Sequence, residues 1–233
     1  MPRHYMIDIE TWDTAPSAVI RAIAIVGFDL KDGHYAIDAT CTSIADCRRT
    51  VDQQIQAGRT VSAETVAWWA TRAPLGPMLN SSRDVANVEV FEPHSLTGVV
   101  ENLLEDLHDL HTDPTTCIWS RGHFDIAILE DLLQTNGRPV PWRHNQVRDV
   151  RTLDEITPPI ESQMPHHPLA DCLAQIGQVC AALRLARADA QPEETRPQRR
   201  TVFGAGFNQP LRRTAGGKAE ATAREDPSTT GAE

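Results

Sequence analysis

The feature that most restricts the fold of this chain of 233 residues is an isoleucine- and valine-rich run at residues 18–30. A proline two residues earlier and a turn sequence at residues 31–33 bound this run, and strand-like segments stand on either side of it, at residues 5–12 and 34–42. Neighbouring strands joined by tight turns are typical of an antiparallel meander. We therefore expect three antiparallel strands at the start of the fold.

Beyond residue 90 the hydrophobic pattern alternates between helix and strand. Leucine and valine recur at three- and four-residue spacing from Leu96 to Leu110, which is the pattern of one apolar helix face. The same reasoning predicts a strand at residues 115–120, a helix at 123–134, a strand at 146–153 and a long helix at 168–186. Together these segments predict an α/β domain with a mixed five-stranded sheet flanked by helices.

The composition changes near residue 188. From there on glycine, proline, alanine and threonine dominate, and large apolar side chains are few. Such a segment buries too little apolar surface to offset its ordering entropy, so we expect a domain at residues 1–187 and a disordered tail at 188–233. The stretch at residues 199–213 contains arginine and phenylalanine. It could be a peptide that docks on a partner or an arm that contacts nucleic acid, and the alternative is a plain solvated tail.

Charge and hydropathy exclude several classes of function. Acidic residues outnumber basic ones by 32 to 22, and the net charge of −10 argues against a passive nucleic-acid binder, which usually presents a basic face. An enzyme whose acidic residues hold metal ions is not excluded. No apolar run reaches the roughly 20 residues that cross a bilayer, and the N-terminus lacks the apolar core of a signal peptide. The expectation is a cytoplasmic protein without a membrane span.

Asp8 and Glu10 place two carboxylates at alternate positions of the first predicted strand. Alternate strand residues project from the same face, so both acids point one way while Ile7 and Ile9 point the other. At roughly 4 Å and an effective dielectric near 20, two carboxylates repel by about 4 kcal/mol unless a cation or a proton intervenes. A divalent metal ion is the natural partner, and a solvent-facing acidic strand end is the alternative.

Asp125 lies in the first turn of the helix predicted at residues 123–134. It precedes three apolar residues of the core-facing stripe by three, four and seven positions, so its side chain points toward the sheet. The helix dipole is sufficient to explain an outward-facing acid there, but it explains an inward-facing one less well. Immediately before this helix, Gly122 lets another backbone or a ligand come close.

The last predicted helix carries a histidine and an aspartate at its start. Pro168 suits the first helical position, which puts His166 in the loop before the helix and Asp171 on its first turns. A loop histidine five residues before a helical aspartate can approach the same point in space. Alone, this common pattern indicates no particular chemistry.

Together these residues resemble the DEDDh branch of the DnaQ-like 3′-5′ exonucleases, which share the ribonuclease H-like fold. Asp8-Ile9-Glu10-Thr11 matches the first motif, Gly122 with Phe124-Asp125 the second, and His166 to Asp171 the third. The resemblance covers residues 4–186. The Thr-x-x-Trp-Trp sequence at residues 65–69 and the Asp-x-Arg-Thr sequence at 149–152 are similar to phage DexA-type exonucleases and their mycobacterial exoribonuclease-like relatives.

The motifs depart from the usual family pattern at three places. Pro168 replaces a small residue, Cys172 replaces an alanine, and Ser120-Arg121 stands where the group often has Gly-Asn. None of these departures removes an expected ligand.

The resemblance implies a two-metal-ion hydrolase that releases nucleoside monophosphates from the 3′ end of single-stranded DNA or RNA. Asp8, Glu10, Asp125 and Asp171 would hold two Mg²⁺ or Mn²⁺ ions, which prefer hard oxygen ligands. His166 would be the general base, a role suited to an imidazole with an unperturbed pKa of about 6.5. The expected partner is the 3′ end of a single-stranded nucleic acid. A homodimer is also possible.

The resemblance also implies substrate contacts by Thr11, Gly122, Arg151 and one of Trp68 and Trp69. Neighbouring residues on a helix point about 100° apart, so one tryptophan packs inward and the other can stack on the terminal base. The sequence does not distinguish the two, and core packing of both is the alternative.

Two other functions stay open as alternatives. A catalytically inactive module on the same fold would bind nucleic acid or recruit a partner, but such a descendant is free to lose the five catalytic side chains, all of which are present. Another ribonuclease H-like nuclease, such as an endonuclease, would share the acids without requiring the histidine.

Overall fold

The computed structural model describes residues 4–31, 34–72, 88 and 90–189. All features described below belong to one compact unit within residues 1–191. The sequence predicts a disordered tail, and from residue 190 on that tail lies outside the described residues.

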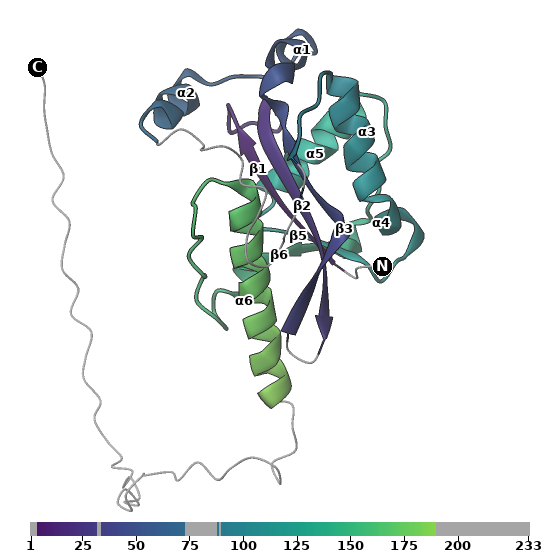
Figure 1. The fold of residues 1–233 in the computed structure, drawn as a ribbon, viewed down its shortest axis with the longest axis vertical. Helices are drawn as coiled ribbons and strands as arrows, with labels where there is room; N and C mark the ends of the chain where they lie inside the picture. Colours follow the sequence, from purple (N-terminus) through teal and green to yellow (C-terminus); the bar gives the residue numbers. More distant parts are fainter. Residues whose placement is uncertain (1–3, 32–33, 73–87, 89, 190–233) are drawn as a thin grey trace, which may run out of the picture. The chain divides into compact units, whose positions relative to one another are not determined.

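The centre of the described fold is a six-stranded mixed sheet with the order β4-β3-β2-β1-β5-β6 (Figure 1). An antiparallel meander of three long strands forms one half: β1 (His4–Thr11), β2 (Ile20–Lys31) and β3 (His34–Asp46). Three short strands pair in parallel with their neighbours: β4 (Val90–Phe91), β5 (Cys117–Ser120) and β6 (Val147–Asp149). The predicted α/β class with a mixed sheet is confirmed, whereas the predicted strand number is wrong by one because β4 joins the edge at β3.

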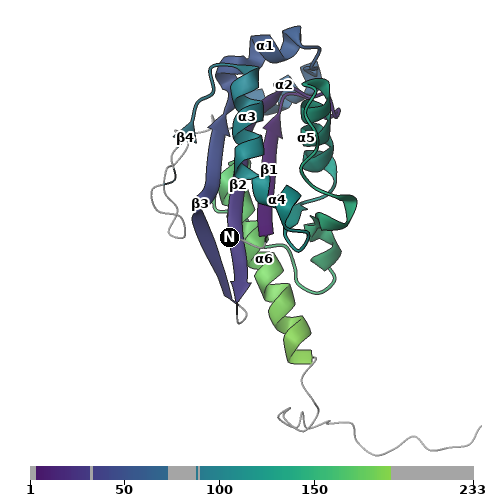
Figure 2. The same ribbon diagram turned by 90° about the vertical axis from the view of Figure 1, so that its right-hand side faces the viewer.

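Helices cover both faces of this sheet (Figures 1 and 2). One face carries α3 (Leu96–Asp106), α4 (His108–Thr112) and α5 (Phe124–Thr135), and the other carries α6 (Pro168–Asp189). The chain after β3 forms η1 (Cys47–Thr50), α1 (Val51–Gln56) and α2 (Ala63–Ala70), and short turns of helix flank β6 as η2 (His144–Gln146) and η3 (Val150–Leu153). Figure 1 shows α1 and α2 at the end of the sheet where β1 finishes.

Side chains alternate along β1 between two separate cores. Tyr5, Ile7 and Ile9 point into the apolar cluster beneath α3 and α5, whereas Met6 points into the cluster beneath α6. The even-numbered acids of the same strand therefore project on the α6 side. Each fully buried large apolar side chain contributes roughly 1.5–3 kcal/mol, so the α3–α5 face of β1 stabilises the fold.

Two predicted elements differ from the structure. The strand predicted at residues 146–153 is wrong beyond Asp149, because Asp149 Oδ1 accepts hydrogen bonds of 2.8 Å from the backbone nitrogens of Gly122 and Arg151, and η3 begins there. The single helix predicted at residues 96–110 is two helices, since α3 ends at Asp106 and α4 begins at His108. Pro168 does begin α6, as predicted.

By length and composition alone, α6 is long and apolar enough to cross a membrane. Half of that segment is buried in the fold, where Cys172, Ile176 and Val179 pack in one cluster with Met6 and Ala24 of the sheet. Burial against a sheet is the pattern of the core helix of a globular domain, and it accounts for the apolar composition.

Candidate active site

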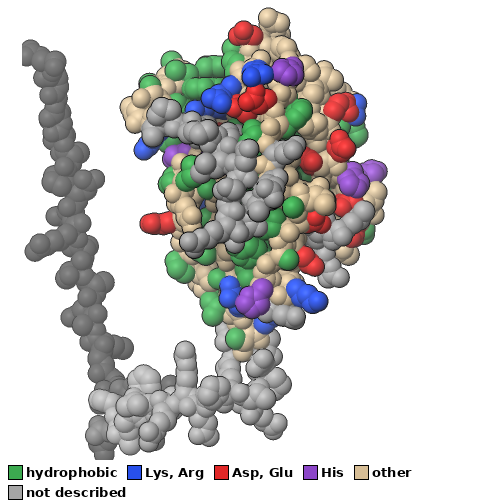
Figure 3. Space-filling view, in the orientation of Figure 1, with side chains coloured by type: hydrophobic (Ala, Val, Ile, Leu, Met, Phe, Trp, Pro, Cys, Tyr) green, Lys and Arg blue, Asp and Glu red, His purple; other side chains and the backbone are tan. Residues whose placement is uncertain are grey.

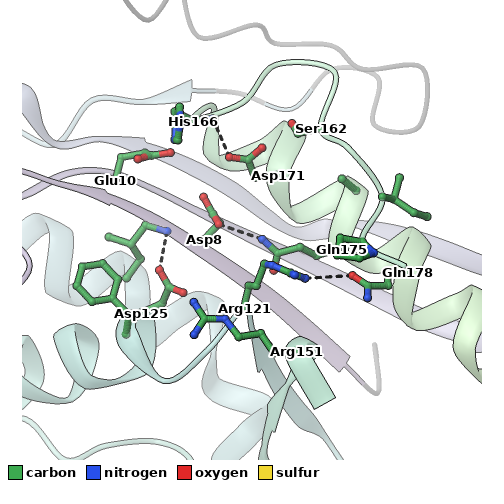
Figure 4. A pocket seen from close by; sticks show the side chains of 15 residues that line it. Asp8, Glu10, Arg121, Asp125, Arg151, Ser162, His166, Asp171, Gln175 and Gln178 are labelled. Atoms are coloured by element: carbon green, nitrogen blue, oxygen red, sulfur yellow. Dashed lines mark hydrogen bonds between the residues drawn. The ribbon is translucent and has the colours of Figure 1, made fainter. Parts of the chain in front are cut away.

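The five predicted catalytic residues line one cavity of about 470 Å³ (Figure 4). Asp8 and Glu10 come from β1, Asp125 from the first turn of α5, His166 from the loop before α6, and Asp171 from the first turns of α6. The parallel pairing of β5 with β1 brings the start of α5 to the carboxyl end of β1. Elements far apart along the chain thus present their polar side chains to one space.

Three of these side chains are arranged as potential metal ligands. Ligand atoms of Glu10, His166 and Asp171 all lie within 4.8 Å of one another. The backbone nitrogen of His166 donates a 2.9 Å hydrogen bond to Asp171 Oδ2, which ties the loop to the helix. His166 adopts φ +66°, in the left-handed region that is uncommon outside glycine, so surrounding contacts must hold it there.

Asp8 and Asp125 complete the acid cluster. Gln175 Nε2 donates a 3.1 Å hydrogen bond to Asp8 Oδ1, and the backbone nitrogen of Ile9 donates one of 3.2 Å to Asp125 Oδ1. Asp125 is only 5% exposed, so the prediction that it points inward from α5 is confirmed. Its bond to Ile9 fixes the start of α5 against β1 between the two acids of that strand.

Crowding and burial raise the pKa of several of these carboxyl groups. Burial is the largest cause for Asp8, whose pKa lies well above the usual value, and the charges of Asp125, Glu10 and Asp171 raise it further. Burial is also the main reason that the pKa of Glu10 is raised to about 8 and that of Asp125 to about 7. A cation among these groups would offset both causes, and their oxygen ligands are those that Mg²⁺ or Mn²⁺ prefers.

Two arginines form another wall of the cavity (Figure 4). Arg121 donates hydrogen bonds of 2.9 Å to Asp154 Oδ2 and 3.2 Å to Gln178 Oε1. Arg151 lies against Gly122, where an added Cβ would be 2.8 Å from the guanidinium carbon. Gly122 also has φ +93°, a backbone conformation that favours glycine, whereas an added Cβ would displace only the mobile end of the Arg151 side chain.

A second cavity of about 410 Å³ adjoins the first through Ile9, Glu10 and Phe124, which line both. Its remaining walls come from the segment after β1 and from α2, including Thr11, Asp13, Thr14, Ser62, Glu64, Thr65, Trp68 and Trp69. Phe124 is 37% exposed at the junction, so an apolar ring is available where the two cavities meet.

The two tryptophans of α2 differ in exposure. Trp69 is 8% exposed and donates a 2.8 Å hydrogen bond from Nε1 to the carbonyl of Thr11, whereas Trp68 is 37% exposed. The sequence predicted one inward and one outward ring, and the structure identifies Trp68 as the outward one. Both rings lie edge-on to His166, with centroid distances of 4.8 Å for Trp68 and 5.9 Å for Trp69.

Several residues that line these cavities were not predicted to be functional, and Gln175, Arg121 and Phe124 are three of them. Gln175 stands four residues after Asp171, so the only available signal was the one-turn spacing that puts both on one helix face. Arg121 was noted only as a departure from the family pattern, although it lines the same cavity as the acids. Phe124 was noted only as part of the second motif.

Charges of both signs are interspersed on the face shown in Figure 3. Among the described side chains visible there, no broad basic surface is present, in keeping with the net charge of −10. Arg121 and Arg151 bring positive charge into the acid-lined cavity itself.

No curated protein matches the chain. Residues 3–183 match the protein family described as the 3'-5' exoribonuclease Rv2179c-like domain, and the matched range contains every residue named above as lining the two cavities. The family assignment supports a nuclease that acts in the 3′-5′ direction, as the motifs predicted. The chain therefore belongs to the 3'-5' exoribonuclease Rv2179c-like family.

Proposed function

We propose that this chain is a metal-dependent exonuclease that removes nucleoside monophosphates one at a time from the 3′ end of single-stranded nucleic acid, with RNA as the preferred substrate. The observation that carries the proposal is the convergence of four acids and His166 in a cavity that shares three lining residues with a second, aromatic-lined cavity. The family description favours RNA over DNA.

The acids fit a pair of Mg²⁺ or Mn²⁺ ions held by Asp8, Glu10, Asp125 and Asp171. Three observations support this metal site. All four side chains offer oxygen ligands, Glu10 and Asp171 lie close together, and burial and mutual repulsion raise the pKa of Asp8 and Glu10. When bound, such ions would supply a hydroxide nucleophile at neutral pH and stabilise the charge on the phosphate in the transition state.

His166 is placed to accept a proton from a water molecule in the same cavity. Its ring is partly exposed, lies beside Glu10 and Asp171, and packs edge-on against Trp68 and Trp69. A general base needs both access to water and a fixed position, and typically contributes 10²–10⁴-fold to the rate. The bond from its backbone to Asp171 supplies part of that fixed position.

The two cavities suggest how a 3′ end would lie. The terminal nucleoside would occupy the cavity beside Trp68 and Phe124, where stacking on an aromatic ring is worth roughly 1–3 kcal/mol per base without strong sequence preference. Its phosphate would then lie among the acids, and Arg121 and Arg151 would contact the phosphate of the preceding nucleotide. Thr11 lines the nucleoside cavity, while Gly122 acts by admitting Arg151.

The test is product analysis on matched 5′-labelled RNA and DNA oligonucleotides. A ladder that shortens from the 3′ end, release of nucleoside monophosphates, a faster rate on RNA, and loss of activity in EDTA are expected. Internal cuts would instead indicate an endonuclease, and binding without products in Mg²⁺ and in Mn²⁺ would indicate an inactive module. An Asp8→Asn protein purified in parallel controls for contaminating nucleases.

A further inference from the structure

Gln175 has a hydrogen-bonding arrangement that packing alone does not explain. It lies on α6 in contact with the acid-lined cavity and is only 7% exposed. Its Nε2 donates to Asp8 Oδ1, yet its Oε1 is buried without a hydrogen-bond partner among the described residues. An unpaired buried acceptor is unfavourable, so a purely structural position would be better filled by an apolar side chain of similar size.

The orientation of the Gln175 amide group is related to the neighbouring Asp8 carboxyl group. In the structure Gln175 presents its NH₂ group to Asp8, as Figure 4 shows, and this is the orientation that an Asp8 ionised by a bound cation would require, because a carboxylate only accepts hydrogen bonds. The carbonyl oxygen is then left without a hydrogen-bond donor in the part of the chain that the structure describes. Gln175 nevertheless lines the cavity into which the acids point, so its amide serves the acid cluster rather than the packing of α6.

Another buried glutamine on the same helix shows the contrast. Gln178 is 1% exposed, and its amide is fully used: Nε2 donates to Asp154 Oδ1 and to the carbonyl of Thr157, and Oε1 accepts from Arg121. Gln178 thus joins α6 to the loop after η3. Within the described ranges, the side chain of Gln175 makes no such link, and its hydrogen-bond partner there is Asp8, an acid of the site.

We propose that Gln175 is a positioning residue for the metal site: its amide N–H group orients the Asp8 carboxylate toward the cavity in which a metal ion would bind. This inference rests on the proposed function. Partners that orient metal ligands typically change metal affinity by about 10–100-fold when they are removed. A neutral amide can orient the Asp8 carboxylate without adding a fifth negative charge to the four acids. It also adds no positive charge that would compete with the metal ion.

The experiment compares Gln175→Leu with Gln178→Leu in the full-length, metal-stripped protein. Mn²⁺ affinity is measured by calorimetry and thermal stability by melting in EDTA. For Gln175→Leu we expect Mn²⁺ affinity to fall by about 10–100-fold, with a melting temperature equal to or above that of the wild type because an unpaired buried acceptor is removed. For Gln178→Leu we expect the reverse, a lower melting temperature with unchanged Mn²⁺ affinity.

A functional readout completes the test. The Mg²⁺ concentration that gives half-maximal hydrolysis should rise for Gln175→Leu by the same factor as the Mn²⁺ dissociation constant. Wild-type Mn²⁺ affinity in a folded Gln175→Leu protein overturns the inference while leaving the proposed nuclease intact. Failure of both Gln175→Leu and Gln175→Met to fold would make Gln175 structural and likewise overturn it. A wild-type protein that neither binds Mn²⁺ nor hydrolyses RNA overturns the proposed function as well.

Discussion

The two faces of β1 affect the stability of the fold in opposite ways: burial of the apolar side chains on one face stabilises it, whereas burial of the acids on the other face opposes it. On the side of α3 and α5, Ile7 and Ile9 are buried in a continuous apolar cluster. On the side of α6, Asp8 and Glu10 face other acids, and burial and repulsion raise the pKa of both. Residues that stabilise the fold therefore alternate, one by one, with residues whose charges oppose it in the absence of a cation.

This contrast separates stability from activity along one strand. An apolar residue and an acid that are neighbours in sequence share their backbone environment, so substitutions of the two differ mainly in which face they change. Removing an acid should relieve repulsion and abolish the chemistry. Removing an apolar side chain should open a cavity and leave the chemistry intact in molecules that stay folded.

The largest expected effect is that of Asp8→Asn. Loss of several kcal/mol of transition-state stabilisation corresponds to a fall of about 10⁴-fold in kcat/KM on labelled RNA. The melting temperature in EDTA should stay equal or rise, because one of the repelling charges is gone. Retained hydrolysis, or a large fall in melting temperature, would contradict the contrast between the two faces.

His166→Ala tests a site residue that is not one of the crowded acids. We expect kcat to fall by about 10²–10⁴-fold with KM little changed, because the missing group acts on a proton rather than on substrate binding. Because the proposed function assigns the metal ions to the four acids and the proton transfer to His166, this change, unlike Asp8→Asn, should leave Mn²⁺ affinity near that of the wild type although His166 lies within ligand distance of Glu10 and Asp171. Single-turnover hydrolysis and calorimetry measure the two quantities, and an unchanged kcat would remove His166 from the mechanism.

Ile7→Ala changes the opposite face of β1. Truncating a fully buried isoleucine typically costs about 2–5 kcal/mol of unfolding free energy, which urea unfolding would measure. The value of kcat/KM at 15 °C, corrected for the folded fraction, should match that of the wild type. A loss of activity as severe as that of Asp8→Asn would mean that the two faces are not separable.

The smallest expected effect is a pH dependence of the metal-free protein. Glu10 has a folded pKa of about 8 against an ordinary value of 4.5, so between these values the folded state binds more protons than the unfolded state. Stability is then greatest at the acidic end of this window and falls as pH rises through it. We expect the melting temperature in EDTA to drop by about 5 °C between pH 5.5 and 8.5.

Two controls accompany the pH measurement. Glu10→Gln should reduce this slope, since it removes the titrating group, and saturating Mn²⁺ should raise the melting temperature most at high pH. A slope that is identical in wild type and Glu10→Gln would show that other groups cause it.

Much of the fold could be predicted because its periodicity is local. Alternation along β1 placed the acids on one face, and Pro168 marked the start of α6. The two-residue strand β4 is too short for any period to be visible. The end of β6 depends on Asp149 binding the backbone of Gly122, a contact between distant segments that hydrophobic patterning does not encode.

In the candidate site, too, the residues that occur in local sequence motifs could be predicted, and those placed by contacts between distant segments could not. Its acids and histidine occur in motifs with recognisable spacing, and the structure brings them to one cavity. Gln175 and Arg121 have no such spacing, since their positions near the acids follow from the packing of α6 and the turn after β5 onto the sheet. Which tryptophan faces outward likewise depends on the hydrogen bond from Trp69 to the carbonyl of Thr11.

The wall that the two cavities share has a consequence for turnover. Ile9, Glu10 and Phe124 border both spaces, so a nucleoside bound in one would, under the proposed function, have its phosphate in the other. After each cut, the liberated mononucleotide would still fill the position that the shortened strand must enter. Product inhibition is thus built into the proposed enzyme, and its rate would fall as monophosphates accumulate.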